Sequence, residues 1–246
     1  MRVLVLDTVD STNTYAMRHF DEVADRVLVS AREQTAGRGR LGRKWVAPPG
    51  DSLTVSLAMS RVASGFHAGA VAGLAVLDLV REAVPSADPY LKWPNDVYCT
   101  DAKLAGILCE GRLSGGKLDG VVVGIGVNVN LSSADAARID QRATGLKILA
   151  PESDFSPDQL ARRLAFFLER WYINYDYNCE GVLGSWRREN RLIGREITVI
   201  EPSGKELRGR FSAIDADGSM VLETASGRRI FRCGDVKIAK GFSPRG

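Results

Sequence analysis

The pattern of apolar and polar residues changes once along the chain, near residue 190. Before that point, short apolar runs rich in Val and Leu, which are typical of buried strands, are mixed with longer stretches of helical periodicity. The predicted strands cover residues 2–6, 26–30, 52–59 and 120–131. Residues 69–84 predict a helix, which ends before Pro85 because proline cannot continue it.

A second helix is predicted to begin at Ser156. Ser156 and Gln159 have the spacing of a capping box, and Pro157 occupies the first helical position, where proline is favoured. Apolar residues then recur on one helical face, as expected for a helix that packs on a core. These residues are Leu160, Leu164, Phe167, Leu168 and Trp171.

From about Gly194 the chain consists of short strand patterns separated by turn dipeptides. The turns are marked by Ser203-Gly204, Asp217-Gly218 and Ser226-Gly227. Four or five strands in roughly 50 residues predict a small barrel of the SH3-like kind. We therefore expect an α+β protein in which residues 1–190 form a mixed sheet flanked by helices. Residues 191–246 would form the barrel.

Composition and charge narrow the range of functions. The 246 residues include 33 Lys and Arg against 30 Asp and Glu, so no polyelectrolyte partner is implied and any cationic role must be local. The N-terminus is too quickly acidic for a signal peptide, and no apolar run is long enough to span a bilayer. We expect a cytoplasmic protein without membrane contact. The cysteines at 99, 109, 179 and 233 lack metal-site spacing and are expected to be reduced thiols.

Residues 37–44 form a cationic, glycine-rich segment that contains G-x-G-x-x-G. Its three glycines and four cations come without a carboxylate. A dinucleotide site would need these glycines to open a helix, but Pro48 and Pro49 follow closely. The segment is therefore either an Arg-Gly tract for nucleic acid or a loop that closes over an anionic small molecule. Because unpaired cations repel each other, we expect the loop to stay open until its ligand arrives.

The segment 120–130 has two chemically different faces if it is a strand. The odd-numbered residues from Val121 to Val129 are apolar, whereas the other face carries glycines and asparagines. The second face consists of Gly124, Gly126, Asn128 and Asn130. Glycines there allow either a ligand or a packed helix to approach the backbone closely.

Two further segments carry polar residues near predicted element ends. In "KWPND", Trp93 is extended because Pro94 follows it, and Asn95-Asp96 resembles a turn. Lys103 begins an apolar run and is either a solvated strand end or a cation directed into a site. Residues 11–14 place hydroxyls and an amide at a helix start, as a helix cap or as a donor-rich ligand site.

Taken together, these segments resemble the biotin protein ligases. The resemblance rests on five motifs that follow one another along the chain. They are "DSTN" (10–13), "QTAGRGRLGRKW" (34–45), "KWPND" (92–96), "KLAGIL" (103–108) and "GIGVNVN" (124–130). The resemblance implies a class II synthetase-like catalytic domain followed by a small C-terminal barrel.

The resemblance also implies a two-step reaction. Biotin is first activated with ATP and Mg²⁺ to biotinyl-5′-AMP, and a lysine of a biotin carboxyl carrier domain then takes the biotin. Such chemistry needs positioning and charge stabilisation rather than a covalent enzyme intermediate. We expect a monomer or a weak homodimer.

The matched motifs assign roles to individual residues. The residues implied to bind biotin are Ser11, Thr12, Asn13, Gln34, Gly37, Arg38, Lys103 and Gly106. Those implied to bind ATP or the adenylate are Gly39, Arg40, Arg43, Trp45, Asn95, Asp96 and Asn128. Lys103, Arg38 and Arg40 are the implied catalytic residues, and Asp96 is the implied metal ligand.

The sequence departs from the family pattern in two places. Only nine residues precede Asp10, so the helix-turn-helix module of some members is not expected, and neither is specific DNA binding. The family can also stack an aromatic ring on adenine after the "GVN" strand, yet no aromatic residue lies between Asn130 and Phe155. Two alternatives stay open. They are a lipoate ligase or octanoyltransferase on the same fold, and a nucleic-acid-binding protein that uses the Arg-Gly loop.

Overall fold

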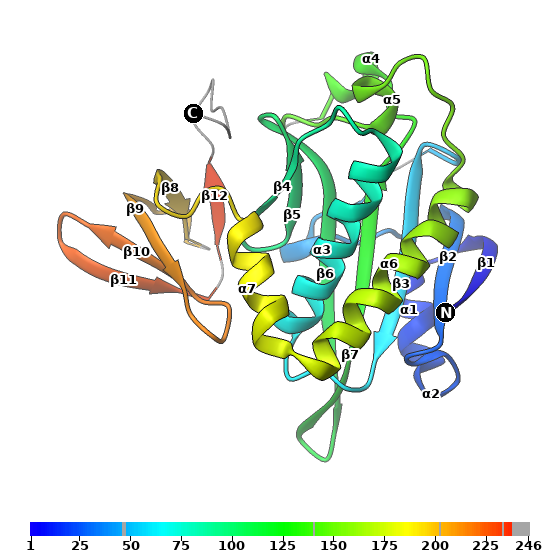
Figure 1. Ribbon diagram of the computed structural model, residues 1–246, viewed down its shortest axis with the longest axis horizontal. Coiled ribbons are helices and arrows are strands. Elements are labelled where there is room, and N and C mark those ends of the chain that lie inside the picture. The colour runs from blue at the N-terminus through cyan, green and yellow to red at the C-terminus, as the bar shows by residue number, and fades with distance from the viewer. Residues whose placement is uncertain (46–47, 140, 202, 233, 238–246) are drawn as a thin grey trace.

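A seven-stranded mixed sheet forms the larger part of the protein (Figure 1). The computed structural model describes residues 1–45, 48–139, 141–201, 203–232 and 234–237. The strands are β1 (Arg2–Val9), β2 (Val27–Gln34), β3 (Ser52–Met59), β4 (Pro89–Lys92), β5 (Asp96–Cys99), β6 (Ala102–Ser114) and β7 (Lys117–Asn128). They lie in the order β1-β2-β3-β7-β6-β5-β4, with β1 and β2 parallel and the other pairs antiparallel.

Helices cover both faces of this sheet. They are α1 (Thr12–Arg18), α2 (Phe20–Val23), α3 (Gly65–Ala83), α4 (Ser133–Ala136), α5 (Leu146–Leu149), α6 (Pro157–Tyr177) and α7 (Cys179–Glu189). Figure 1 shows α3, α6 and α7 in front of the sheet and α1 and α2 behind it. No helix within these described ranges is long and apolar enough to cross a membrane.

Strand parity explains how one sheet serves two packing layers. On β7, Val121 and Val123 belong to the main core beneath α3 and α6, whereas Val122 belongs to a smaller cluster with Ala16 and Phe20 of α1 and α2. Successive side chains of a strand point to opposite faces, so each layer receives alternate residues. The glycine face of β7 therefore lies on the same side as α1, away from α3 and α6.

The C-terminal part is a five-stranded antiparallel sheet. Its strands are β8 (Glu196–Ile200), β9 (Glu206–Ile214), β10 (Met220–Thr224), β11 (Gly227–Phe231) and β12 (Asp235–Lys237). They pair in the order β11-β10-β9-β8-β12. Gly204, Gly218 and Gly227 have φ values of +84°, +86° and +111°, which favour glycine at the predicted turns. The α+β class and its small C-terminal β unit are confirmed.

Most predicted element boundaries need only small corrections. The four predicted strands appear as β1, β2, β3 and β7, although β7 begins at Lys117 and ends at Asn128. The helix predicted at 69–84 begins earlier because Ser64 caps it, accepting a hydrogen bond from the amide of His67. Helix α6 begins as predicted, and Ser156 accepts from the amide of Gln159. Cys233 lies outside the described residues, and the other three cysteines are free thiols.

Candidate active site

A cavity of about 880 Å³ opens on the face of the sheet that carries α1. Fourteen of the fifteen predicted site residues line it. They are Ser11, Thr12, Asn13, Gln34, Arg38, Gly39, Arg40, Arg43, Trp45, Asn95, Asp96, Lys103, Gly106 and Asn128. The fifteenth, Gly37, begins the loop and packs against its other stem, where a Cβ atom would approach the carbonyl oxygen of Trp45 to 2.4 Å. Residues far apart in sequence are thus brought to one site.

A polar pocket forms one end of the cavity at the start of α1. Gln34 Oε1 accepts hydrogen bonds from the backbone amide of Thr12 at 2.8 Å and from its hydroxyl at 3.1 Å. The hydroxyl of Ser56 reaches Thr12 Oγ1 at 2.8 Å and Asn13 Oδ1 at 2.6 Å. Ser11 occupies the helix N-cap position, but its side chain makes no capping bond. Hydroxyls and amides in this enclosed pocket suit a neutral polar ligand group.

The glycine face of β7 is closely covered by two side chains. A Cβ atom at Gly124 would lie 2.2 Å from Asn13 Oδ1, and one at Gly126 would lie 2.6 Å from the indole of Trp45. Because Asn13 belongs to α1, the expectation of a closely packed helix is confirmed at Gly124, whereas a loop residue covers Gly126. The Trp45 indole nitrogen is buried without a hydrogen-bond partner among the described residues.

The glycine-rich segment folds as a short hairpin over the cavity and does not open a helix. A single 3-10 turn covers Arg40–Gly42, and the backbones of Arg38 and Lys44 pair on either side of it. Within the turn, Leu41 has φ +55°, in the left-handed region. This geometry supports the argument against a dinucleotide-binding loop.

The expectation of unpaired loop cations is wrong for the three arginines. Arg38 binds Glu110 at 2.9 Å, Arg40 binds Asn95 Oδ1 at 2.8 Å, and Arg43 pairs with Asp235. The hydrogen bond that Arg43 donates to Asp235 raises the pKa of its guanidinium group. The partners come from β6, the "KWPND" turn and β12, so the local sequence could not reveal them.

Asp96 and Lys103 form the charged centre of the cavity. Lys103 Nζ lies 2.8 Å from Asp96 Oδ1, so the lysine is neither a solvated strand end nor free. A Cβ atom at Gly106 would lie 3.3 Å from Lys103 Nζ, and glycine there lets the lysine lie across β6. Lys92, 4.0 Å from Asp96 Oδ2, is buried, and its burial lowers the pKa of its ammonium group.

Asn95 and Asn128 tie the cavity walls together. Asn95 Nδ2 donates to the carbonyl of Ile107 at 2.7 Å, while its oxygen accepts from the loop arginine described above. Asn128 Nδ2 donates to the carbonyl of Thr144 at 2.9 Å and holds the segment after α4 against the start of β6. The cavity is also lined by Ile139 and Arg142 from that segment.

Three residues that contribute to the site were not predicted from the sequence. Lys92 stands in the "KWPND" motif but was given no role. Glu110 shares a strand face with Gly106, so strand parity could have found it. Asp235 belongs to the C-terminal sheet, and no sequence pattern connects it to the loop.

The cavity has polar side chains at the start of α1 and the cationic loop over Lys103, an arrangement that suits a ligand with a neutral polar group and an anionic group. The chain belongs to the biotin/lipoate A/B protein ligase family, which matches residues 5–128. Residues 192–238 match the biotin protein ligase C-terminal domain.

Known relatives extend this match over most of the chain. A biotin–[acetyl-CoA-carboxylase] ligase of Paracoccus denitrificans is 33% identical over 94% of this chain and 98% of its own length. A ligase of the same name from Mycobacterium tuberculosis is 34% identical over 86% of this chain and 79% of its own. The structure of the Aquifex aeolicus biotin protein ligase in complex with biotin and ATP has a TM-score of 0.79. It is 26% identical and covers 96% of this chain and 97% of its own.

Proposed function

We propose that this chain is an ATP-dependent biotin protein ligase that forms biotinyl-5′-AMP and transfers biotin to a lysine of a carboxylase carrier domain. The observation that carries the proposal is the cavity, which joins a polar pocket at Thr12 and Gln34 to a cationic loop over Lys103. The names of the Paracoccus and Mycobacterium relatives support the same activity and the same acceptor class.

The polar pocket favours biotin over lipoate. Biotin ends in a cyclic urea with one acceptor and two donors, whereas the dithiolane ring of lipoate forms no comparable hydrogen bonds. The pocket offers the side chains of Thr12 and Gln34, which line the cavity, while the fully buried Ser56 hydroxyl hydrogen-bonds to Thr12. A dithiolane ring would displace water from these polar groups without forming hydrogen bonds to them, which would penalise lipoate.

In the first step, a carboxylate oxygen of biotin attacks the α-phosphorus of ATP. The bond to the bridging oxygen breaks, and pyrophosphate leaves with that electron pair. We assign Lys103 to the charge that develops at the α-phosphate, because its ammonium group lies on the cavity wall. Asp96 holds that ammonium group at the cavity wall, with Oδ1 2.8 Å from Lys103 Nζ. Arg40, whose partner Asn95 is neutral, is assigned to the phosphates.

Magnesium would enter with the nucleotide. The described residues contain no group of three or more His, Cys, Asp or Glu side chains that could hold a metal ion. This fits Mg²⁺, which proteins commonly bind through one or two carboxylates together with phosphate oxygens. Asp96 is the carboxylate we assign to it, and bound Mg²⁺ would neutralise phosphate charge.

In the second step, the neutral amine of the acceptor lysine attacks the carbonyl carbon of the mixed anhydride. An amide bond forms, the amine loses a proton, and AMP leaves. The loop and Trp45 cover the cavity and would limit hydrolysis of the anhydride. We further propose that residues 1–190 act as the biotin- and ATP-binding domain and residues 191–246 as the small barrel.

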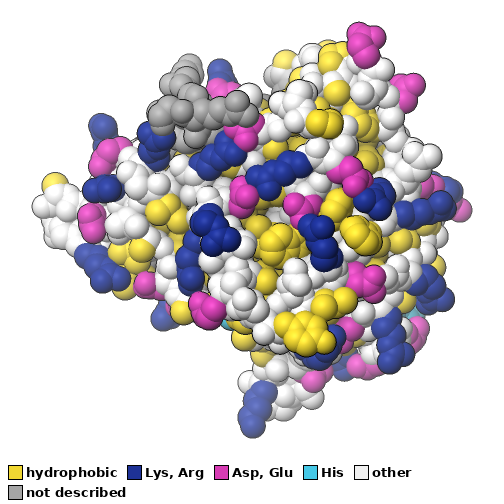
Figure 2. All heavy atoms as spheres, viewed as in Figure 1, with side chains coloured by type: hydrophobic (Ala, Val, Ile, Leu, Met, Phe, Trp, Pro, Cys, Tyr) yellow, Lys and Arg dark blue, Asp and Glu magenta, His cyan; other side chains and the backbone are white. Residues whose placement is uncertain are grey.

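The nucleic-acid alternative has weak support in the geometry. Two of the four loop cations, Arg38 and Arg43, are neutralised by carboxylates. On the face that carries α3 and α6, Lys and Arg side chains alternate with Asp and Glu side chains (Figure 2). This face therefore lacks the concentrated positive charge of a backbone-binding surface, and on the opposite face these two loop arginines are already paired.

The test is an adenylation assay with ATP, Mg²⁺ and either biotin or lipoate. We expect release of pyrophosphate and formation of biotinyl-5′-AMP with biotin, and biotin transfer when a carrier domain is added. Adenylation of lipoate in preference to biotin would replace the proposal by the lipoate ligase alternative. If neither acid is activated and RNA binding weakens steeply with salt, the nucleic-acid alternative is correct.

A further inference from the structure

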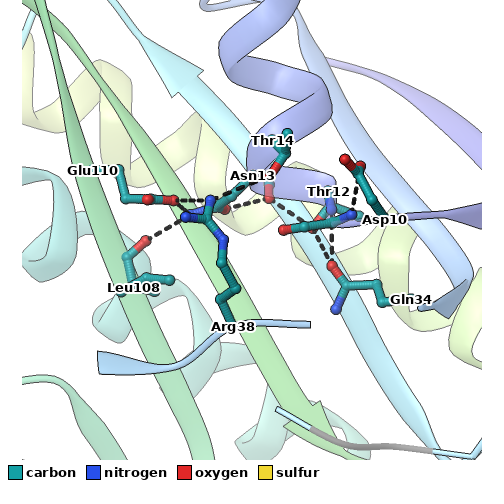
Figure 3. A network of polar contacts seen from close by, with 10 residues as sticks. Asp10, Thr12, Asn13, Thr14, Gln34, Arg38, Leu108 and Glu110 are labelled. Atoms are coloured by element: carbon teal, nitrogen blue, oxygen red, sulfur yellow. Dashed lines mark hydrogen bonds and ion pairs between the residues drawn. The ribbon is translucent and has the colours of Figure 1, made fainter. Parts of the chain in front are cut away.

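Glu110, near the middle of β6, joins the polar pocket to the cationic loop without lining the cavity itself. Its Oε2 atom accepts from Asn13 Nδ2 at 2.7 Å and from Arg38 Nη2 at 2.9 Å. Figure 3 shows the Arg38 guanidinium group between Glu110 and the start of α1. We propose that Glu110 is a positioning residue that fixes Arg38, so that Arg38 anchors the loop while Arg40 meets the phosphates. This inference rests on the proposed function.

The Asn13 side of this link is rigid. Asn13 Oδ1 accepts from the buried hydroxyl of Ser56 at 2.6 Å, and its Nδ2 also reaches the carbonyl of Leu108 at 3.3 Å. Gly124 lies directly beneath the amide, which leaves no free volume on that side. Because Asn13 is held on three sides, Glu110 is oriented by a fixed donor and can act as a stable anchor.

The Arg38 side fixes the whole hairpin. Arg38 Nη2 also donates to Thr14 Oγ1 at 3.3 Å. Within the hairpin, the Gly39 amide donates to the Arg43 carbonyl at 2.7 Å, and the Trp45 amide donates to the Gly37 carbonyl at 3.0 Å. The two stems are thus linked to each other, and holding Arg38 in place also holds the opposite stem over the cavity.

Charge separates the roles of the loop arginines. Glu110 neutralises Arg38 and Asp235 neutralises Arg43, whereas Arg40 binds only the neutral amide oxygen of Asn95 in the contacts described. A guanidinium group without a carboxylate partner attracts an incoming phosphate more strongly. The inference therefore gives Arg38 the role of an anchor and Arg40 that of a phosphate-binding cation, where the resemblance implied a catalytic role for both.

The first experiment compares Glu110→Gln with wild type by limited trypsin digestion without ligand. Because the charged pair is lost, we expect cleavage within residues 38–44 to become about five- to tenfold faster. Asp21→Asn is the matched control. It removes the charge from an exposed pair with Arg112, which lies on the same strand as Glu110. Its cleavage rate should equal that of wild type.

The second experiment separates anchoring from catalysis by steady-state adenylation kinetics. Glu110→Gln and Arg38→Ala should each raise the KM for biotin about five- to tenfold and keep kcat within about threefold of wild type. Arg40→Ala should instead lower kcat, by about 100-fold. Glu110→Asp, which keeps the charge, should recover part of the KM. The double variant of Glu110→Gln and Arg38→Ala should be no worse than either single variant.

Two results would overturn the inference. One is a Glu110→Gln protein with a cleavage rate and a KM within twofold of wild type. The other is an Arg38→Ala protein that loses kcat as Arg40→Ala does. The digestion needs no biotin chemistry, so it tests the anchor even if wild type fails to activate biotin, which would refute only the proposed function.

Discussion

Replacing Gly126 by alanine would place a methyl group against the indole of Trp45. The added Cβ atom would lie 2.6 Å from both Cε2 and Cζ2 of the ring, closer than real Cβ contacts. The backbone cannot retreat easily, because Gly126 pairs with Thr54 on one side and Gly106 on the other. The indole must therefore move, and with it the end of the glycine-rich loop.

The loss of folding free energy follows from how closely this contact is packed. Inserting a methyl group into a closely packed contact costs about 1–3 kcal/mol. For a chain of this size, each kcal/mol lowers Tm by about 2–4 °C, so we expect a decrease of about 2–12 °C. If the same strain opposes the closed position of Trp45 over a ligand, biotin should bind about 5- to 150-fold more weakly.

Thermal unfolding and calorimetric titration with biotin measure the two effects. Gly184→Ala is the control, because its Cβ atom would lie 3.5 Å from the flexible end of Arg188 on α7. Alanine in a helix interior should raise the stability of the control by up to about 1 kcal/mol without changing its affinity for biotin. A Gly126→Ala protein with unchanged Tm and unchanged biotin affinity would show that Trp45 does not rest on this glycine in solution.

Three other predictions concern the charged centre, the loop and the thiols. Lys103→Ala should fold normally but form the adenylate about 100-fold more slowly in a pyrophosphate-release assay, and normal adenylation would remove Lys103 from the mechanism. Biotin with MgATP should slow tryptic cleavage within residues 37–44, because the bound ligands should order the loop. If protein that has made the adenylate is cleaved at the same rate with and without these ligands, the loop is not ordered by its ligand. Burial raises the pKa of the Cys99 and Cys109 thiols, so of the three described cysteines iodoacetamide at pH 8 should modify the half-buried Cys179 first, as mass spectrometry of timed samples would show.

Local patterns predicted those parts of the fold that depend on local physics. The parity of residues 121–129 correctly identified a buried face on β7, and Ser156 correctly marked the start of α6. Strands β4 and β5 were missed because each has only four residues, too few for an alternation pattern. The start of α3 was misplaced because Ser64 precedes the apolar run by several residues.

The candidate site shows the same division between local and non-local information. The motifs located the residues that line the cavity, but they could not supply the pairing between them. The Arg38–Glu110 pair joins residues 72 positions apart, and the Arg43–Asp235 pair joins residues 192 positions apart. Such contacts depend on how strands are ordered in the sheets, which no local spacing encodes. For this reason the loop was expected to be open, whereas its arginines are bound.

The C-terminal sheet completes the cavity as well as the fold. Asp235 on β12 holds Arg43 of the loop, and Ile200 and Val236 line the cavity beside it. Trp93 of the "KWPND" turn donates its indole hydrogen to the carbonyl of Gly218, 2.9 Å away in the turn before β10. The cavity is therefore bounded by both sheets, and one of the three arginine contacts of the loop, Arg43 with Asp235, depends on the C-terminal sheet. A substitution that destabilises β12 should therefore disturb the position of the loop more than the polar pocket at α1. Thr12 and Gln34 have no contact with that sheet among their described hydrogen bonds.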